Sequence, residues 1–447
     1  MVSAFTSYFM NTYAVVIDSD MIRNTLQTNV DESLDLFSLK LLIYIFFLGL
    51  IPSYYVYKIP LKNSSFKEAL INKIKTIFIS IIIILILLFS FSKFYTSFFR
   101  EHKPLRYYTN PSYWIYSIGN YISKTLNSGP IVVKKTGLDA HIEQQSSEQP
   151  RLLIMVVGEA SRADHFSLNG YDKETNPLLK QENIINFSNV SSCGTSTAHS
   201  VPCMFSIYDR DDYSYKKGIR KENVLDVLKH SKEVEILWRD NNSNSKGVAV
   251  RVPFEDYRTD KTNSKCDSVE CRDEGMLVGL DEYITKHKNR NIIIVLHQMG
   301  NHGPAYYKRY PKAFEKFTPV CQTNQLEKCD KESISNAYDN AILYTDNFLS
   351  KTIHLLKKHN NSHQTAMIYM SDHGESLGEN GLYLHGLPYM MAPDAQTHIG
   401  TVAWFEENKQ LTQNPKEYSQ DNLFHTLLGL FNVKTEVYKK EMDMFNE

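Results

Sequence analysis

Apolar positions follow two patterns along the chain: long runs near the N-terminus and short runs after residue 150. The first long run covers residues 36–57 and contains one charged side chain, Lys40. The second reads IKTIFISIIIILILLFSF from residue 74 to residue 91. Since a helix of about 20 apolar residues crosses a bilayer, the pattern predicts two membrane-spanning helices, at about 36–57 and 74–93.

Basic residues between the two predicted spans indicate how the chain crosses the membrane. Lysines near the ends of spans favour the cytoplasmic side, and the loop region holds Lys58, Lys62, Lys67, Lys73 and Lys75. The rest of the chain is therefore expected outside the cytoplasm. Aromatic and basic side chains over residues 94–116 are typical of a segment in the headgroup layer. Residues 1–127 are thus predicted to form a transmembrane and interfacial helical region.

The remainder of the chain alternates between strand and helix patterns. Short apolar runs that read as buried strands cover residues 152–157, 234–238, 292–296 and 366–370. Helical patterns at 224–230 and 340–358 lie between them. This alternation predicts an α/β fold with a mostly parallel central sheet flanked by helices. Residues 128–150 are polar and are predicted to link the helical region to a globular domain at 151–447.

The charge balance limits the classes of binding partner, and the cysteine positions indicate the cellular compartment. Lysine and arginine number 49 against 50 acidic residues, which removes a general electrostatic case for nucleic-acid binding. All six cysteines follow the predicted spans, at 193, 203, 266, 271, 321 and 329. Pairing between neighbours would suit an oxidising compartment, although six cysteines formally allow 15 connectivities. Zinc binding by these cysteines is the weaker alternative, because no C-x-x-C spacing occurs.

Potential metal ligands follow three of the predicted strands directly, in VVGEASRADH, LHQMGNHGPA and YMSDHGESLGENG. Strand ends of a parallel sheet meet at one edge, so Glu159, Asp372 and His373 are candidate ligands of a divalent cation. Hydroxyls are plentiful in SSCGTSTAHSVPCMFS at 191–206. A threonine there could act as a nucleophile if a metal activated it. From these residues alone, structural roles in caps and turns remain open.

Longer motifs sharpen this interpretation through a family resemblance. The motifs are GEASRADH at 158–165, CGTSTAHSVPC at 193–203, WRDNNSNSKG at 238–247, HQMGNHGPAY at 297–306 and SDHGESLGENG at 371–381. Together they resemble the lipid A phosphoethanolamine transferases, which include transferable colistin-resistance enzymes. The resemblance covers the whole domain after the spans and implies the fold of the alkaline-phosphatase and sulfatase superfamily.

The resemblance also implies site residues. One tightly bound zinc would be held by Glu159, Thr197, Asp372 and His373. Thr197 would also be the nucleophile, since the family pattern selects the second threonine of CGTST and rejects Thr195.

Further residues match family positions beside the substrate. His302 and His385 lie near the substrate phosphate in the family, where they could bind a second zinc or donate the proton that the leaving alkoxide needs. Asn242 and Lys246 match residues near the bound substrate, although a solvated turn would be the ordinary interpretation of that lysine. The family's disulfides imply the pairs Cys193 with Cys203, Cys266 with Cys271 and Cys321 with Cys329.

The function that the resemblance implies is transfer of phosphoethanolamine from phosphatidylethanolamine to a lipid A phosphate, through a covalent threonine intermediate. A monomer in the bacterial inner membrane, with its catalytic domain in the periplasm, is expected, and the product would confer resistance to polymyxin and cationic peptides. The family usually has five transmembrane helices, so its first helices are expected to be missing here.

Several alternatives stay open. The acceptor could be another glycan, or water in a phosphodiesterase of the same superfamily, and a non-catalytic lipid-sensing protein is a candidate from another class. A sulfatase is disfavoured because its nucleophile motif is absent: Cys203 is followed by Met-Phe-Ser-Ile.

Overall fold

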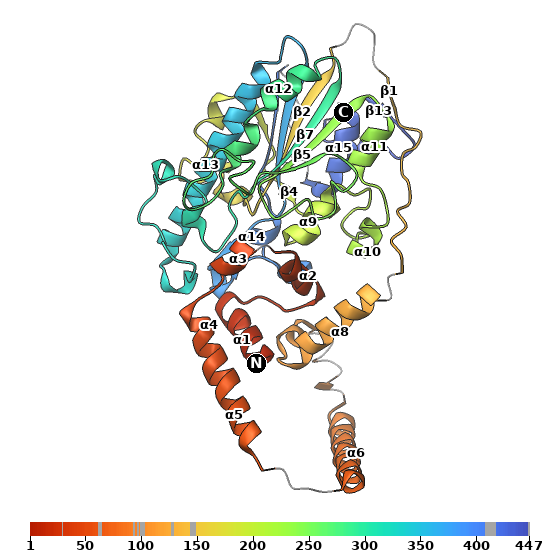
Figure 1. Ribbon diagram of the computed structural model, residues 1–447, viewed down its shortest axis with the longest axis vertical. Coiled ribbons are helices and arrows are strands. Elements are labelled where there is room, and N and C mark those ends of the chain that lie inside the picture. Colours follow the sequence, from red (N-terminus) through yellow and green to blue (C-terminus); the bar gives the residue numbers. More distant parts are fainter. Residues whose placement is uncertain are drawn as a thin grey trace.

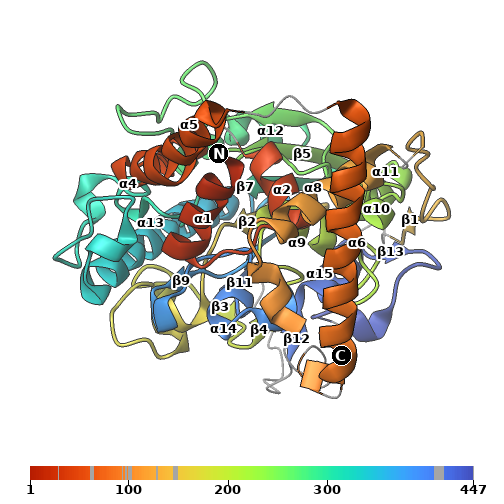
Figure 2. The ribbon, with the colours of Figure 1, turned by 90° about the horizontal axis from the view of Figure 1, so that it is seen from below.

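The computed structural model describes residues 1–28, 30–60, 65–92, 94–95, 98, 103–126, 129–143, 149–406 and 417–445. An α/β body forms its larger part, and the N-terminal helices lie at one end of that body (Figure 1). Seen from that end, the longest N-terminal helix stands apart from the others (Figure 2).

A seven-stranded sheet runs through the α/β body. In spatial order its strands are β3 (Ile184–Asn186), β11 (Thr401–Phe405), β8 (Gln364–Ser371), β2 (Arg151–Gly158), β7 (Asn291–His297), β5 (Val234–Asp240) and β6 (Phe254–Asp256). Neighbours from β8 to β6 pair in parallel, whereas β11 runs antiparallel to both β8 and β3. The predicted mostly parallel sheet and its four predicted strands are therefore confirmed.

Helices cover both faces of this sheet because alternate side chains of each strand point to opposite faces. In β2, Ile154 belongs to the core on the side of α12 (Leu280–Lys286) and α13 (Lys331–Lys357). Met155 belongs to the core on the side of α11 (Val224–His230) and α15 (Leu423–Leu430). Both side chains are fully buried, and Figure 1 shows helices on both faces of the sheet. The predicted helical patterns at 224–230 and 340–358 are confirmed in α11 and α13.

Shorter elements complete the α/β body. Its remaining α-helices are α9 (Thr197–Met204), α10 (Tyr215–Gly218) and α14 (Asp394–Thr397). Its two-stranded sheets pair β1 (His141–Ile142) with β13 (Val433–Lys434), β9 (Ser376–Leu377) with β10 (Tyr383–Leu384), and β4 (Val190–Ser191) with β12 (Tyr418–Ser419).

Part of the segment expected to be a linker, 128–150, contacts this body. The backbone N–H of Lys134 donates to the carbonyl of Arg220, and that of Thr136 donates to the Glu222 carboxylate. Strand β1 lies in the same segment. Residues 127–128 and 144–148 lie outside the described residues.

The N-terminal part consists of helices. They are α1 (Val2–Tyr13), α2 (Ser19–Gln27), α3 (Val30–Asp35), α4 (Leu39–Tyr44), the π-helical η1 (Ile45–Leu50), α5 (Ile51–Lys58), α6 (Phe66–Ser90) and α8 (Ser112–Leu126).

Two of these helical stretches have the length and composition to cross a membrane. They are the continuous run Leu39–Lys58, of 20 residues, and the 25-residue α6. The first falls on the predicted span at 36–57. The second begins well before the predicted residue 74, because the Ser65 side chain caps the helix by accepting a hydrogen bond from the N–H of Glu68. Lys62 of the predicted basic loop and residue 93 lie outside the described residues.

Helices α1 to α3 join the two parts of the molecule. Helix α2 contacts α9, and the hydroxyl of the buried Tyr13, the last residue of α1, donates to the carbonyl of Asn324 at 3.4 Å. The hydrophobic pattern predicted no such contact, since α2 and α3 are short and polar in sequence. The N-terminal region therefore covers the end of the α/β body that carries α9 (Figure 1).

Removing side-chain volume at the centre of the sheet should destabilise the protein. Ile294 of β7 is fully buried between Ile154 and Leu237 of the neighbouring strands. Ile294→Ala should lower the free energy of unfolding by about 2–5 kcal/mol and Ile294→Val by about 0.5–1.5 kcal/mol. Urea unfolding of the detergent-solubilised chain, followed by tryptophan fluorescence, measures both. An alanine variant as stable as the valine variant would contradict the packing described here.

Candidate active site

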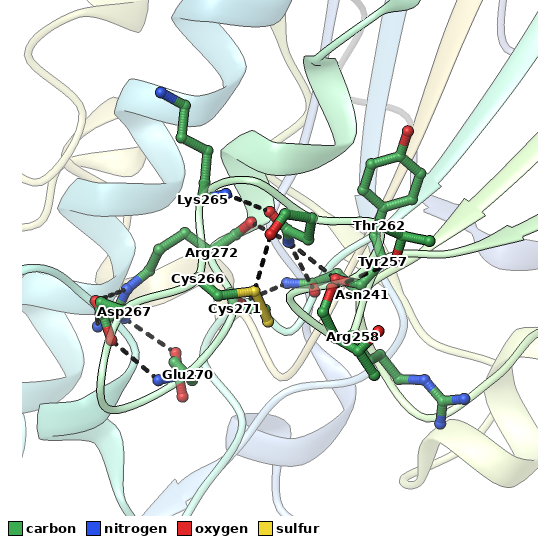
Figure 3. The surroundings of a disulfide bond; sticks show 12 residues. Asn241, Tyr257, Arg258, Thr262, Lys265, Cys266, Asp267, Glu270, Cys271 and Arg272 are labelled. Carbon is green, nitrogen blue, oxygen red and sulfur yellow. Dashed lines mark hydrogen bonds and ion pairs between the residues drawn. A yellow bond between two sulfur atoms is a disulfide. The ribbon is translucent and has the colours of Figure 1, made fainter.

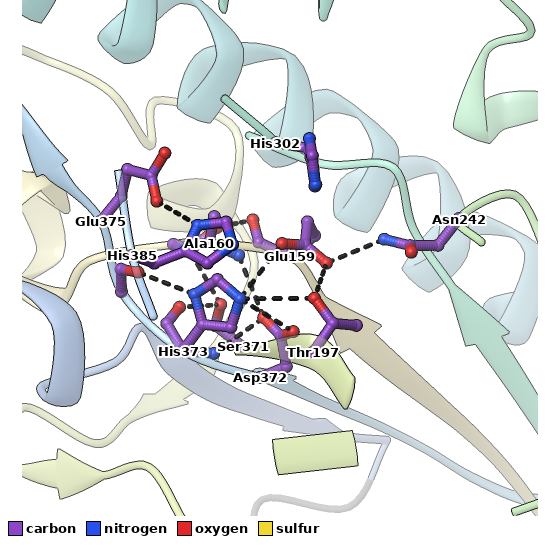
Figure 4. A network of polar contacts seen from close by, with 12 residues as sticks. Glu159, Ala160, Thr197, Asn242, His302, Ser371, Asp372, His373, Glu375 and His385 are labelled. Atoms are coloured by element: carbon purple, nitrogen blue, oxygen red, sulfur yellow. Dashed lines mark hydrogen bonds and ion pairs between the residues drawn. The ribbon is translucent and has the colours of Figure 1, made fainter. Parts of the chain in front are cut away.

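Two neighbouring strands deliver the centre of the candidate site. Strand β2 ends at Gly158 and β8 at Ser371, and these residues are directly opposite in the parallel ladder. The next residues, Glu159 from β2 and Asp372 with His373 from β8, therefore lie at the same edge of the sheet (Figure 4). The sequence predicted this meeting of strand ends.

The three side chains form a compact, fully buried group. His373 Nε2 lies 3.4 Å from Glu159 Oε1 and 3.3 Å from Asp372 Oδ2. His373 Nδ1 lies 2.8 Å from the carbonyl oxygen of Gly374, to which it must donate its proton. Burial lowers the pKa of His373, which favours the neutral ring. The lone pair of Nε2 then faces the carboxylates, as in a histidine that ligates a metal.

Asp372 offers a further reason to place a cation here. Its Oδ1 accepts hydrogen bonds from the backbone N–H groups of Ala160, at 3.1 Å, and His373, at 2.7 Å. Its Oδ2 is buried and accepts no hydrogen bond from the described residues. Potential ligand atoms of Glu159, Asp372 and His373 all lie within 4.8 Å of one another. Carboxylate oxygens and an imidazole nitrogen are a donor set that zinc accepts.

Thr197 adjoins this group at the first position of α9. Its Oγ1 donates a hydrogen bond to Glu159 Oε2 at 3.0 Å and lies 3.4 Å from His373 Nε2. The hydroxyl of Thr195 points elsewhere and donates to the carbonyl of Leu387 at 2.6 Å. The structure thus brings Thr197, and not Thr195, to the potential metal ligands. Its place at a helix N-terminus would also favour negative charge on a bound phosphoryl group.

A histidine pair stands on the other side of the group. The rings of His302 and His385 have centroids 5.9 Å apart, and His385 lies 4.2 Å from the ring of His373. His385 Nδ1 lies 2.7 Å from Glu375 Oε2, and the Tyr306 hydroxyl donates to the other oxygen of Glu375 at 2.7 Å. A carboxylate accepts only, so Nδ1 of His385 carries the proton.

Glu375 is a site residue that the sequence reasoning missed. It lies inside the quoted motif SDHGES, two residues after His373, and that position was the signal available. Another group of potential metal ligands among the described residues consists of His373, Glu375 and His385. This group joins His385 to Glu375, whereas the sequence analysis paired His385 with His302 for a second zinc.

His302 is held in its neutral form. Burial lowers its pKa well below the ordinary value of 6.5, and the nearby Arg309 guanidinium lowers it further. A neutral imidazole can accept a proton or a hydrogen bond from a substrate at neutral pH.

Asn242 and Lys246, the two residues expected near the substrate, lie in different parts of the site. Asn242 Nδ2 donates to Glu159 Oε2 at 2.8 Å and to the carbonyl of Gln298 at 2.9 Å, so it orients the carboxylate of Glu159. Lys246 is buried, and its Nζ donates to the carbonyl of Gln27 in α2 at 3.4 Å. This ammonium therefore lies where the N-terminal helices meet the α/β body.

All six cysteines form disulfides between neighbours, as the resemblance implied. Cys193–Cys203 connects the segment before Thr197 to the last turn of α9. Cys266–Cys271 closes a small loop whose Cys271 carbonyl accepts a hydrogen bond from Asn241, beside the site residue Asn242 (Figure 3). Cys321–Cys329 lies before α13.

An apolar cavity of about 440 Å³ opens beside the histidine pair. Four residues of the α/β body contribute to it: His302, Gly303, Leu384 and His385. The rest of its wall comes from residues 2–41 and from Trp114 and Ile118 of α8. The site therefore has a polar side in the α/β body and an apolar side in the N-terminal region.

Two family models match the chain in succession. The model described as "Phosphoethanolamine transferase EptA/EptB" matches residues 1–126, and the model described as "Sulfatase" matches residues 151–433. The boundary between the matches falls in the segment that joins the helical region to the α/β body.

Individual relatives agree with these matches. Phosphatidylethanolamine transferase Mcr-1 of Escherichia coli is 44% identical over 453 residues, covering 98% of this chain and 83% of the relative. Kdo(2)-lipid A phosphoethanolamine 7''-transferase of Escherichia coli K12 is 27% identical over 267 residues, covering 59% of this chain and 45% of the relative. The solved lipooligosaccharide phosphoethanolamine transferase A (EptA) of Neisseria meningitidis has a TM-score of 0.93 at 35% identity, covering 99% of this chain and 84% of that one.

The lowered pKa of His302 has a measurable consequence. The folded chain should keep this ring unprotonated well below the ordinary pKa of 6.5. The unfolded chain takes up that proton as the pH falls through 6.5, so His302 should reduce stability below that pH and not above it. NMR of histidine-labelled protein, with His302→Gln to assign the signal, follows the titration. A midpoint at or above 6.5 would contradict the burial described here.

Proposed function

The chain belongs to the phosphoethanolamine transferases of the EptA and Mcr type, and from that premise we propose that it carries phosphoethanolamine on Thr197 between two membrane lipids. The donor is phosphatidylethanolamine and the acceptor is a phosphate of lipid A. The observation that carries the proposal is the contact of the buried Thr197 hydroxyl with Glu159, 3.0 Å away, inside a group of potential metal ligands.

Zinc fits the donor set at this point. Glu159, Asp372 and His373 would hold it together with Thr197, and the buried Oδ2 of Asp372 accepts no hydrogen bond from the described residues. When bound, zinc favours the deprotonated hydroxyl of Thr197 and stabilises negative charge on phosphoryl oxygens. The carboxylate of Glu159, oriented by Asn242, holds the hydroxyl in place.

The first half-reaction is an attack of Thr197 Oγ1 on the donor phosphorus. A bond forms between Oγ1 and phosphorus, and the bond from phosphorus to the diacylglycerol oxygen breaks. The departing oxygen needs a proton. His385 is suited to provide it from Nε2, because Glu375 binds Nδ1 at 2.7 Å and stabilises the protonated ring.

His302 has the complementary role. With its lowered pKa it stays neutral, so it can take up the proton that the Thr197 hydroxyl loses on attack, and it can accept a hydrogen bond from the acceptor. In the second half-reaction an oxygen of the lipid A phosphate attacks the phosphorus on Thr197. The bond to Oγ1 breaks, and phosphoethanolamine leaves on the acceptor.

The apolar cavity suits the lipid part of such a substrate. The cavity has a volume of about 440 Å³ and a mostly apolar wall. It opens at the histidine pair, where the diacylglycerol oxygen would lie. Burying apolar chain atoms there is favourable, at about 0.8 kcal/mol for each buried CH₂ group.

The proposed reaction implies where in the cell the protein acts. Residues 1–127 lie in and on the bacterial inner membrane, and residues 151–447 act in the periplasm. Each added ethanolamine amine offsets negative charge on lipid A, which weakens the attraction of cationic peptides such as polymyxin and gives resistance.

Intact mass spectrometry can locate the covalent intermediate. After incubation with phosphatidylethanolamine, the full chain should gain the mass of one phosphoethanolamine group. Thr197→Ala should abolish the gain, while Thr195→Ala, which removes a hydroxyl bound to Leu387, should retain it. An adduct that maps to Thr195 would make the assignment wrong. Diacylglycerol release without transfer to lipid A, even at saturating lipid A, would favour the phosphodiesterase alternative.

Metal content tests the proposed ligands separately from turnover. Asp372→Asn replaces a charged ligand by a neutral one and should lower the zinc bound per chain, measured by elemental mass spectrometry after dialysis against a weak chelator. Loss of a ligand should weaken affinity by about 10–100-fold or more, since even outer partners of metal ligands have effects of that size. Thr195→Ala is the matched control and should keep its zinc. Equal zinc content in both variants would contradict the assignment of Asp372 as a zinc ligand.

A further inference from the structure

One guanidinium joins three segments that are distant in the sequence. Arg309 follows the short helix Tyr306–Lys308, and its side chain is only 4% exposed. Its Nε donates to the carbonyl of His302 at 2.7 Å. Its Nη1 binds Glu270, and its Nη2 binds Asp35 Oδ2 at 3.0 Å. Arg309 therefore touches the loop of a site histidine, the α/β body and the N-terminal region at once.

On the N-terminal side the partner is the last residue of α3. The carboxylate of Asp35 is bound by Arg309 and by Lys308, and its side chain is 11% exposed. The backbone carbonyl of Asp35 accepts a further hydrogen bond from Asn324. Neutralising this carboxylate would leave two neighbouring cations short of a partner in a mostly buried place.

On the other side the partner belongs to the loop closed by Cys266–Cys271. Glu270 binds Arg309 through one oxygen. Its other oxygen binds Arg272 at 3.1 Å (Figure 3). This loop is anchored to the α/β body, because Arg272 also donates to the carbonyl of Lys308 at 2.6 Å. Glu270 therefore belongs to the α/β body, and Asp35 is the partner that the N-terminal region contributes.

The loop that carries His302 has a second support. Asp273 accepts hydrogen bonds from the backbone N–H groups of Met299 at 2.9 Å and Gly300 at 3.1 Å. These bonds hold the beginning of the loop, whereas the bond from Arg309 holds the carbonyl of His302 itself. The Arg309 guanidinium is therefore one of the groups that hold the backbone of His302.

Only a planar group with several fixed donors can make these contacts together. Arginine offers five N–H donors in a rigid fork, whereas lysine has a single ammonium that cannot reach three partners in different directions. A buried ion pair is weak evidence for added stability, so the interest of these contacts lies in the groups that they hold together.

We propose that Arg309 is a positioning residue that transmits the docking of α3, through Asp35, to His302. When α3 is docked, Asp35 holds the guanidinium and the guanidinium holds His302. When α3 is away, His302 loses its fixed place. The catalytic consequence rests on the function proposed above for His302, but the structural coupling does not.

The test compares two substitutions across the same interface. Asp35→Asn removes the charge that reaches Arg309. Glu327→Gln removes the charge of another docking contact, the ion pair with Lys40 of α4 at 2.7 Å, which does not involve Arg309. Both change one carboxylate to an amide in the full chain, and both are first checked for intact fold by circular dichroism and thermal melting.

Turnover with phosphatidylethanolamine vesicles containing lipid A is the first readout. A misplacement of about 1 Å can cost about 10²-fold in rate, so Asp35→Asn should lower kcat by about tenfold or more, with Glu327→Gln near the unaltered chain. Arg309→Lys should resemble Asp35→Asn. In a His302→Gln background, adding Asp35→Asn should cause no further loss, because the effect passes through His302. Equal losses from Asp35→Asn with and without His302 would overturn the proposal.

Hydrogen exchange is the second readout and needs no activity. Amides of residues 298–303 should exchange about tenfold faster in Asp35→Asn than in Glu327→Gln, since their loop loses a fixed contact. If the unaltered chain shows no turnover, the proposed function fails, and faster exchange in Asp35→Asn alone would still support the coupling. Equal exchange in the two variants would refute it.

Discussion

Burying Glu159 and Asp372 beside each other at the ends of two neighbouring strands is the constraint on which the rest of the site depends. Two carboxylates in a dry place repel each other and lose their hydration, so their surroundings must compensate. The protein does this with backbone N–H groups for one oxygen of Asp372, the amide of Asn242 for Glu159, and a neutral imidazole between the two. The parallel ladder between β2 and β8 fixes this arrangement, because Gly158 and Ser371 are held in register.

The elements that create this constraint could be predicted from the sequence. Unbroken apolar runs such as 152–157 and 366–370 identify buried strands, and acidic residues directly after them must then meet at one edge. The choice between Thr195 and Thr197 could not be predicted in this way, because both are small hydroxyl residues in one loop. The prediction of Thr197 came from the family resemblance. In the structure the Thr195 hydroxyl is bound to the carbonyl of Leu387, whereas the Thr197 hydroxyl is bound to Glu159.

Residues that position the site side chains, such as Glu375 and Arg309, could not be predicted from the sequence for a different reason. Glu375 becomes visible only when His385 and Tyr306 fold against it, and Arg309 only when Asp35 arrives from the other part of the molecule. Such contacts join positions far apart in the chain and leave no periodic trace in the sequence. The same holds for α2, whose short polar sequence does not reveal that it lies on α9.

The divided wall of the apolar cavity has a practical consequence for drug discovery. Of the residues that line it, only His302, Gly303, Leu384 and His385 come from the α/β body. A compound screen against residues 151–447 alone would therefore lack most of the wall of this cavity and would favour compounds that bind the polar groups of the site. Inhibitors with an apolar tail would reveal their full affinity only against the whole chain in a lipid or detergent environment.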